Sequence, residues 1–287
     1  MPHETLSRKA GGLSPIGALV REHDRDRFQT ALFAPAGDRE ALFALYAFNY
    51  EIARVRESVR EPMLGQIRLQ WWREAVETAF AGGEPRRHDI AEAIAEVIRR
   101  GRLSRDPFHR LIDTRERDFD ADPPASLAAL EDYAEGSAAP LVTLALEALG
   151  AATPAAREAG RHVGIAYALS GILRALPHLA RVGRLMLPAD LAAQAGLDPH
   201  DISRNLPALR EVAAAIAAAA ARHLGAARAL RPQIPARGFP ALLQARIAAQ
   251  ALRRLERARF DPLAPEIGRG DPLQPWRLAA ASLLKRF

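Results

Sequence analysis

The stretch Arg39-Glu-Ala-Leu-Phe-Ala-Leu-Tyr-Ala-Phe48, continued to Ile52, decides the fold class. Its apolar residues recur at spacings of three and four, which predicts a long helix with Asp38 as its N-cap. Segments of the same kind follow at residues 62–80, 89–101, 106–120, 126–150, 154–176, 206–230, 239–260 and 275–287. Each begins at a cap residue or proline, or ends near a glycine or proline. No segment alternates apolar and polar residues as a strand does, so the sequence predicts an all-α protein.

The composition is that of a globular protein large enough to bury a sizeable core. The 287 residues are 49% hydrophobic and 26% charged, close to the average of folded domains. No long Gly/Ser linker or internal repeat divides the chain. We therefore expect a single helical domain over residues 13–287 behind a loose N-terminal tail at residues 1–12. Cysteine is absent, which excludes disulfides and cysteine-bound zinc and favours a cytoplasmic location.

Arginine supplies nearly all of the positive charge. Lys9 and Lys285 are the only lysines among the 40 Lys and Arg residues, and the net charge is +6. This balance permits contact with phosphate esters or anionic lipid, but a GC-rich genome produces the same composition without any partner. Every apolar stretch of eighteen residues contains a charge, so no transmembrane helix is expected. The sequence shows no basic stripe with interleaved aromatic residues, so we expect no nucleic-acid partner.

Two parts of the chain resemble the squalene and phytoene synthases. Residues Arg39–Phe48 are similar to the helix that leads into the first aspartate-rich motif of that family. Gly164-Ile-Ala, Ile172-Leu-Arg174 and Gly183-Arg-Leu-Met-Leu-Pro188 are similar to its second motif and the stretch that follows. The resemblance implies the isoprenoid synthase helical bundle with a central cavity. In active members, carboxylates on two facing helices hold Mg²⁺ ions, which bind the diphosphates of two prenyl substrates.

The motifs depart from the family pattern at the acidic positions, where five of the six carboxylates are lost. The residues at these positions are Ala53, Arg54 and Glu57 in the first motif and Ala175, His178 and Leu179 in the second. Losing one such group commonly costs orders of magnitude in rate, so losing five should abolish the condensation. His178 has no second ligand at metal spacing, which favours a hydrogen bond at the helix end. We therefore expect no catalytic residue, no metal ligand and no cofactor, with Mg²⁺ needed only if an altered metal site exists.

Six residues are candidates for binding an anion or another ligand in the cavity: Arg54, Arg174, Arg184, Asp118, Tyr46 and Trp72. The resemblance places the arginines at the mouth or wall of the cavity, where guanidinium groups bind a diphosphate, a phospholipid headgroup or a carboxylate without Mg²⁺. The alternative is that Arg174 and Arg184 are inherited framework residues that pair with acids, because a buried unpaired arginine is very costly. Trp72 either lines the cavity or fills the core.

The residues around the altered motifs resemble one subgroup of the family. Tyr46–Val59, Gly65–Trp72, Leu173–His178 and Leu187–Leu191 are similar to the phytoene-synthase-like assembly factors of mitochondrial respiratory complex I and their bacterial relatives. This resemblance implies a non-catalytic binding or assembly factor for complex I subunits or assembly intermediates. Two other hypotheses remain open. One is a prenyltransferase that condenses farnesyl or geranylgeranyl diphosphate with an altered metal site, and the other is a carrier of an isoprenoid or lipid ligand.

The C-terminal segment Trp276–Phe287 also has two interpretations. Basic residues surround Leu278, Leu283 and Leu284, a pattern typical of a helix that lies on an anionic membrane surface. Docking onto the bundle is the alternative for a terminal helix. The first interpretation predicts a cytoplasmic protein that is peripheral to the inner membrane.

Overall fold

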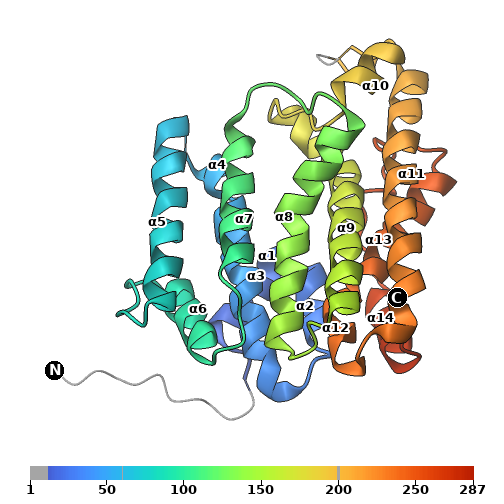
Figure 1. Cartoon of the computed structure of the whole chain (residues 1–287). Coiled ribbons are helices and arrows are strands. Elements are labelled where there is room, and N and C mark those ends of the chain that lie inside the picture. Colours follow the sequence, from blue (N-terminus) through green and yellow to red (C-terminus); the bar gives the residue numbers. More distant parts are fainter. Residues whose placement is uncertain (1–11, 60, 199–200) are drawn as a thin grey trace.

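The computed structural model describes residues 12–59, 61–198 and 201–287, and every regular element in these ranges is a helix (Figure 1). The all-α prediction is confirmed. The helices are α1 (Pro15–His23), α2 (Arg25–Ala31), α3 (Arg39–Ala53), α4 (Val55–Ser58), α5 (Pro62–Phe80), α6 (Asp89–Arg99), α7 (Asp106–Glu116), α8 (Leu127–Ala148), α9 (Pro154–Arg181), α10 (Ala189–Gln194), α11 (Leu206–Leu230), α12 (Phe239–Leu242), α13 (Gln244–Arg257) and α14 (Gln274–Leu283). The expected tail lies outside the described residues except for Gly12, and the division of the chain into a tail and one domain stays a prediction.

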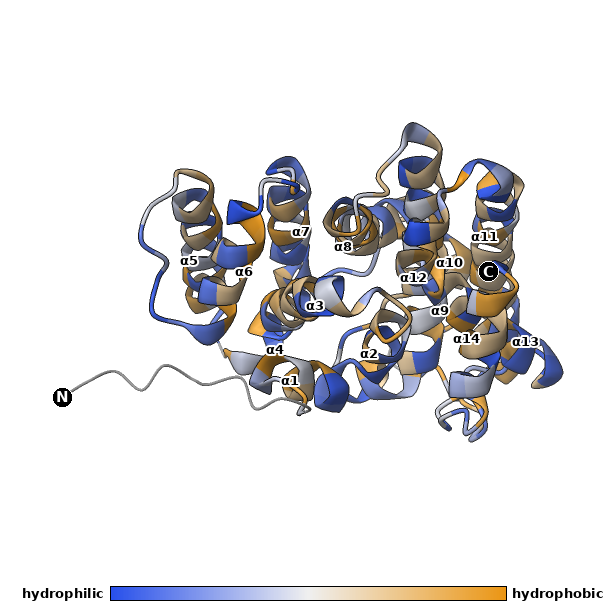
Figure 2. Ribbon diagram, turned by 90° about the horizontal axis from the view of Figure 1, so that it is seen from below, coloured by the Kyte–Doolittle hydropathy of each residue, from blue (hydrophilic) through white to orange (hydrophobic). Residues whose placement is uncertain are grey.

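Helix α9 is the centre of the bundle. It packs against α8 on one side and against α11 and α13 on the other, and Figure 1 shows α5, α7, α8, α9 and α11 side by side. Seen from below, α3 lies in the middle of the bundle (Figure 2), where it contacts α6, α7 and α8. By length and composition alone α9 is apolar enough to cross a membrane, and half of its apolar window is buried. Its packed position accounts for that apolar character without a membrane.

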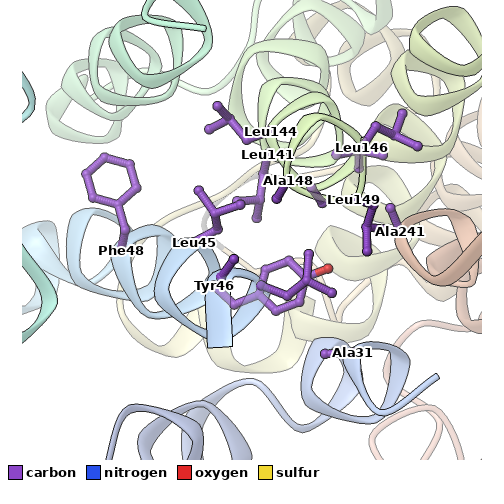
Figure 3. Close-up of a cluster of buried hydrophobic side chains, with 14 of the residues drawn as sticks. Ala31, Leu45, Tyr46, Phe48, Leu141, Leu144, Leu146, Ala148, Leu149 and Ala241 are labelled. Carbon is purple, nitrogen blue, oxygen red and sulfur yellow. The ribbon is translucent and has the colours of Figure 1, made fainter. Parts of the chain in front are cut away.

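The hydrophobic core is built on α3. All residues from Ala41 to Asn49 are buried, which explains why the sequence of this helix is apolar on most of its faces. Figure 3 shows Tyr46 and Phe48 of α3 in one cluster with Leu141 and Leu144 of α8. Burial of each large apolar side chain contributes about 1.5–3 kcal/mol, so this cluster fixes α3 against α8. A second apolar cluster joins α9 to α11.

The helix predicted at residues 106–120 ends at Glu116, and the one predicted at residues 275–287 ends at Leu283. Two further predicted helices differ at a proline or at a turn. The sequence predicts that α9 ends at Leu176, but the helix continues through Pro177 to Arg181. An internal proline costs roughly 3 kcal/mol, and the buried side chains of Leu173 and Leu176 hold this part of the helix in place. The helix expected at residues 239–260 is divided into α12 and α13 at Leu243, where the chain makes a three-residue turn.

The short helices α1 and α2 escape the periodicity analysis, although their cap signals are present in the sequence. Ser14 caps α1 and Asp24 caps α2, each through a side-chain oxygen that accepts a hydrogen bond from a main-chain N–H.

Asp38 behaves differently from the prediction. It stands at the N-cap position of α3, yet its side chain makes no capping hydrogen bond and accepts one from Arg237 Nη2 at 2.7 Å. The ion pair to a distant residue replaces the local cap.

Helices α8 and α9 approach closely at Gly164, and this contact generates a stability prediction. A Cβ atom at Gly164 would lie 2.6 Å from the Cα atom of Ala139 on α8. Gly164→Ala should therefore lower the free energy of unfolding by roughly 1–3 kcal/mol, because a backbone has to move. Gly171→Ala is the control on the same helix. Nothing lies within 4 Å of its Cβ position, so the better helix propensity of alanine should stabilise by up to about 1 kcal/mol. Urea unfolding measures both, and an unchanged Gly164→Ala variant would contradict the close approach.

Candidate functional site

A pocket of about 340 Å³ lies between α3, α8 and α9, and it corresponds to the central cavity that the family resemblance implies. The junction of α1 with α2, Arg115 of α7 and the segment after α9 complete its walls. Helix α9 contributes the largely apolar wall, formed by Ala168, Gly171, Ile172, Ala175 and Leu179. The polar groups of the lining come from the other elements and from Tyr167.

The two altered motifs meet in this pocket. Ala53, the last residue of α3, lines it from the first motif. Ala175 and Leu179 line it from the second motif, on α9. Aliphatic side chains therefore face the pocket at three of the positions where the family pattern has carboxylates. The motif comparison identifies these three replacements in the sequence, and the fold brings the three side chains together in one pocket.

The other three motif positions point to solvent. Arg54, Glu57 and His178 are exposed, and none of them lines the pocket. Arg54 lies against its own helix, with its Nε atom 3.6 Å from Glu51 and its guanidinium carbon 5.3 Å from the centre of the Tyr50 ring. These local contacts hold the Arg54 side chain outside the cavity.

Arg184 and Asp118 belong to one buried polar cluster in the pocket wall. Asp118 is 3% exposed. It accepts hydrogen bonds from Arg184 Nη2 at 2.5 Å, from Tyr133 Oη at 2.6 Å and from Arg115 Nη1 at 3.4 Å. Burial raises the pKa of Tyr133, and the Asp118 carboxylate raises it further against the opposing effect of the two arginines. One carboxylate thus holds two arginines, so Arg184 is not a free anion-binding group.

Arg174 is also paired. Its Nη1 and Nη2 atoms both lie 3.0 Å from Oδ2 of Asp26, the second residue of α2. Burial lowers the pKa of Arg174, but Tyr167 and Asp26 outweigh it and the net shift is upward. The framework interpretation, in which Arg174 and Arg184 pair with acids, describes these contacts.

Arg27 is a pocket residue that the sequence analysis does not identify. It is 8% exposed, and it donates to Asp24 at 2.7 Å and to Gln244 Oε1 at 3.0 Å. Its guanidinium carbon lies 4.7 Å from the centre of the Tyr167 ring, a cation–π contact. Burial raises the pKa of Tyr167. The sequence gives only a weak signal that Arg27 is buried. Its helix is short, and Thr30 and Ala31 are the other buried residues of α2.

Tyr46 and Trp72 lie in the core and do not line the pocket. Tyr46 is fully buried in the cluster of Figure 3, and burial raises its pKa to about 12. The Trp72 ring packs edge-on against Phe48 at 5.5 Å and against Trp71 at 4.9 Å between ring centres. Both side chains serve packing in this structure.

The residues present do not fit a magnesium cluster. Among the described residues that line the pocket, Asp24 is the only carboxylate, and it is paired with Arg27. The described ranges contain no group of three or more His, Cys, Asp or Glu side chains that could hold a metal ion. Mg²⁺ takes hard oxygen ligands in near-octahedral geometry, and this pocket does not supply them.

The squalene/phytoene synthase family matches residues 20–279. The chain belongs to this family. One member, the NADH dehydrogenase (ubiquinone) complex I, assembly factor 6 of Rattus norvegicus, is 34% identical over 271 residues, which are 94% of this chain and 81% of the relative. A presqualene diphosphate synthase of Rhodopseudomonas palustris is 31% identical over 207 residues, which are 71% of this chain and 73% of the relative. The predicted resemblance to both branches is confirmed.

The fold of the family is confirmed as well. A squalene synthase from Alicyclobacillus acidocaldarius has the same fold, with a TM-score of 0.77 at 22% identity over 86% of this chain and 94% of that chain. The squalene/phytoene synthase bundle is therefore intact here, and the difference from the family pattern lies in the side chains at the motif positions, three of which line the pocket.

The buried Asp118 cluster generates the prediction for this site. Asp118→Asn should lower the free energy of unfolding by about 3 kcal/mol, because Arg115 and Arg184 lose their common counter-charge in a buried wall. Asp120→Asn, two residues along, is the control. Asp120 is exposed, so its change should stay within about 0.5 kcal/mol. Urea denaturation compares the two, and equal stability of both variants would show that Asp118 does not hold the wall together.

Proposed function

We propose that this protein is a non-catalytic member of the squalene/phytoene synthase family that acts as an assembly factor for the respiratory NADH dehydrogenase. One observation carries the proposal. Both motif segments line a single pocket, but they present Ala53, Ala175 and Leu179 where ionisation of a prenyl diphosphate needs acidic metal ligands. Such a site keeps the space for a ligand and lacks the groups that would stabilise a departing diphosphate.

The relatives support the assembly role over the synthase role. The complex I assembly factor of Rattus norvegicus and the presqualene diphosphate synthase of Rhodopseudomonas palustris are similar in identity, at 34% and 31%. The assembly factor matches over 94% of the chain and the synthase over 71%. Sequence identity alone separates the two relatives poorly. The aliphatic side chains at the motif positions therefore carry the argument for the assembly role.

The ligand that we propose for the pocket is an isoprenoid or a lipid carrying at most one negative charge, bound without Mg²⁺ or another cofactor. The α9 wall is mostly aliphatic, which suits a hydrocarbon chain. On the polar side, Arg27 is paired with Asp24, while Arg115 and Arg184 share Asp118. One positive charge is thus left in excess, too little to offset a diphosphate.

We propose that this protein acts in the cytoplasm, at the inner membrane where the NADH dehydrogenase is assembled.

An assay for released pyrophosphate tests the loss of catalysis. The purified chain, incubated with Mg²⁺ and farnesyl or geranylgeranyl diphosphate, should release no more pyrophosphate than buffer. The presqualene diphosphate synthase of Rhodopseudomonas palustris serves as the positive control under the same conditions. Pyrophosphate release that depends on both Mg²⁺ and the chain would contradict the loss of catalysis and support the prenyltransferase alternative.

Gene replacement tests the assembly role and the pocket together. Deleting the gene from its own organism should reduce the assembled NADH dehydrogenase on native gels and the NADH oxidation of isolated membranes. Gly171→Leu fills the pocket, since Gly171 lines it and has open space at its Cβ position. This variant should fail to restore assembly.

Gly225→Leu is the matched control, because Gly225 also lies in a helix with open space at Cβ but is exposed and outside the pocket. It should restore assembly fully. Normal NADH dehydrogenase in the deletion strain would contradict the assembly role, and full restoration by Gly171→Leu would contradict the need for a ligand.

A further inference from the structure

The positive charge of the chain is concentrated at its C-terminal end. Residues 244–287 contain nine Lys and Arg against four Asp and Glu, so they carry +5 of the net charge of +6. This segment comprises α13, the loop that follows it, and α14, which packs on α13 and α2. The rest of the chain is close to neutral, so the excess is a local property of one region. We call residues 244–287 the C-terminal basic region.

Several arginines of this region have no acidic partner among the described residues. Arg246, Arg253 and Arg277 line one small pocket between α13 and α14. Arg277 pairs with Asp271, which it shares with Arg254, whereas Arg253 donates only to the neutral Gln250. The Nε atom of Arg246 is buried and has no hydrogen-bond partner. Unlike the arginines of the central pocket, Arg246 and Arg253 have no carboxylate partner among the described residues.

Burial and mutual repulsion lower the pKa of two arginines in and beside this cluster. Burial lowers the pKa of Arg253, and the neighbouring charges of Arg246, Arg277, Arg228 and Arg257 lower it further. Arg228 of α11 shifts in the same direction, through burial and Arg246. The acidic and polar groups that face the cluster are Asp271, Gln250, Gln274 and the main-chain oxygen of Phe287, which accepts from Arg228 Nε at 3.1 Å. An external anion would relieve this repulsion.

Helix α14 of the C-terminal basic region exposes an apolar stripe on the side away from Leu278. Leu278 and Ala281 are buried against the bundle, which fulfils the docking interpretation of the C-terminal segment. The opposite stripe follows the helical spacing of three and four and stays in solvent. It consists of Leu273, Trp276, Ala280, Leu283 and Leu284, with exposed fractions of 75% for Trp276 and 85% for Leu283. Lys285 and Arg286 end the stripe, and both are exposed.

We propose that the exposed stripe of α14 and the C-terminal basic region form a docking site for an anionic lipid bilayer. Trp and Leu side chains at a helix surface partition into the boundary between headgroups and acyl chains, and adjacent cations bind anionic headgroups. The excess charge of +5 in residues 244–287 decides the occupant, because an anionic bilayer supplies many phosphates to the exposed cations of this region, among them Lys285 and Arg286. The inference rests on exposed residues of this chain and does not depend on the assembly role.

A second exposed apolar stripe on the molecule provides an internal control. On α5, Met63 and Ile67 are exposed by 69% and 59%. This helix has two arginines and two glutamates, so it carries no net charge. If apolar exposure alone drove membrane binding, α5 would serve as well as α14. If the charge is essential, only α14 will bind.

Vesicle flotation with the full chain tests the proposal. The chain should float with vesicles of 30% phosphatidylglycerol in phosphatidylcholine, and should not float with pure phosphatidylcholine. Trp276→Ser combined with Leu283→Ser should abolish flotation. Arg253→Gln combined with Arg257→Gln should weaken it by roughly 25-fold, about five-fold for each cation removed. Met63→Ser combined with Ile67→Ser should leave it unchanged. Circular dichroism and thermal unfolding of each variant verify that it is folded.

Tryptophan fluorescence of the wild-type chain provides a second readout, which needs a substitution only to assign the signal. The chain has three tryptophans, and Trp276 is exposed while Trp71 and Trp72 pack in the bundle. Anionic vesicles should shift the tryptophan emission of the wild-type chain to shorter wavelength. Trp276→Phe should abolish this shift while preserving most of the flotation.

Three outcomes would overturn the proposal. The first is no selective flotation of the wild-type chain with anionic vesicles. The second is flotation that survives the Trp276/Leu283 change or is lost with the Met63/Ile67 change. The third is flotation that 10 mM inorganic phosphate removes at constant ionic strength, which would show that the arginines bind a free anion rather than a bilayer.

Discussion

The close approach of α8 and α9 is the constraint on which the pocket depends. Gly164 leaves room for the backbone of α8 at Ala139, and both helices line the cavity beyond this contact. Tyr133, Ser137 and Ala138 of α8 form one wall, while Tyr167 and Gly171 of α9 form another. Because α3 packs on α8 through its apolar face, the position of the first motif also follows from this contact. The family fold can thus survive large changes of pocket chemistry, since the glycine contact involves none of the six altered acidic positions.

The electrostatics of the molecule divide into two regions with opposite character. In and around the central pocket, Arg27, Arg174 and Arg184 each have a carboxylate partner within 3.0 Å. At the C-terminal end, Arg246 and Arg253 have none among the described residues. Paired arginines stabilise the walls that they belong to, and unpaired ones are available to an external anion. The motif comparison selects Arg174 and Arg184 near the cavity, whereas the structure leaves arginines without a carboxylate partner between α13 and α14.

The sequence is sufficient for the helical class, for most helix positions and for the altered motif positions, because these depend on local periodicity and on matched residues. It is less informative about long-range pairs. Nothing near Arg174 in the sequence indicates that Asp26 is its partner, and Arg27 carries no motif at all. The candidate ligands Tyr46 and Trp72 illustrate the same difficulty, since an aromatic residue on a helix face looks alike whether that face meets a cavity or another helix. Pro177 shows that tertiary packing can override a strong local helix-breaking signal.

The passage of α9 through Pro177 has a mechanical consequence for the pocket. Proline has no N–H, so the carbonyl oxygen of Leu173 lacks its usual helical donor at this turn. Leu179, on the far side of the proline, belongs to the pocket wall, whereas Ala168 and Gly171 lie on the regular side. The α9 wall thus consists of a regularly hydrogen-bonded segment and, near its end, a turn that has one backbone hydrogen bond fewer. Any change in the width of the cavity would therefore begin at this turn, where the backbone of α9 has one hydrogen bond fewer.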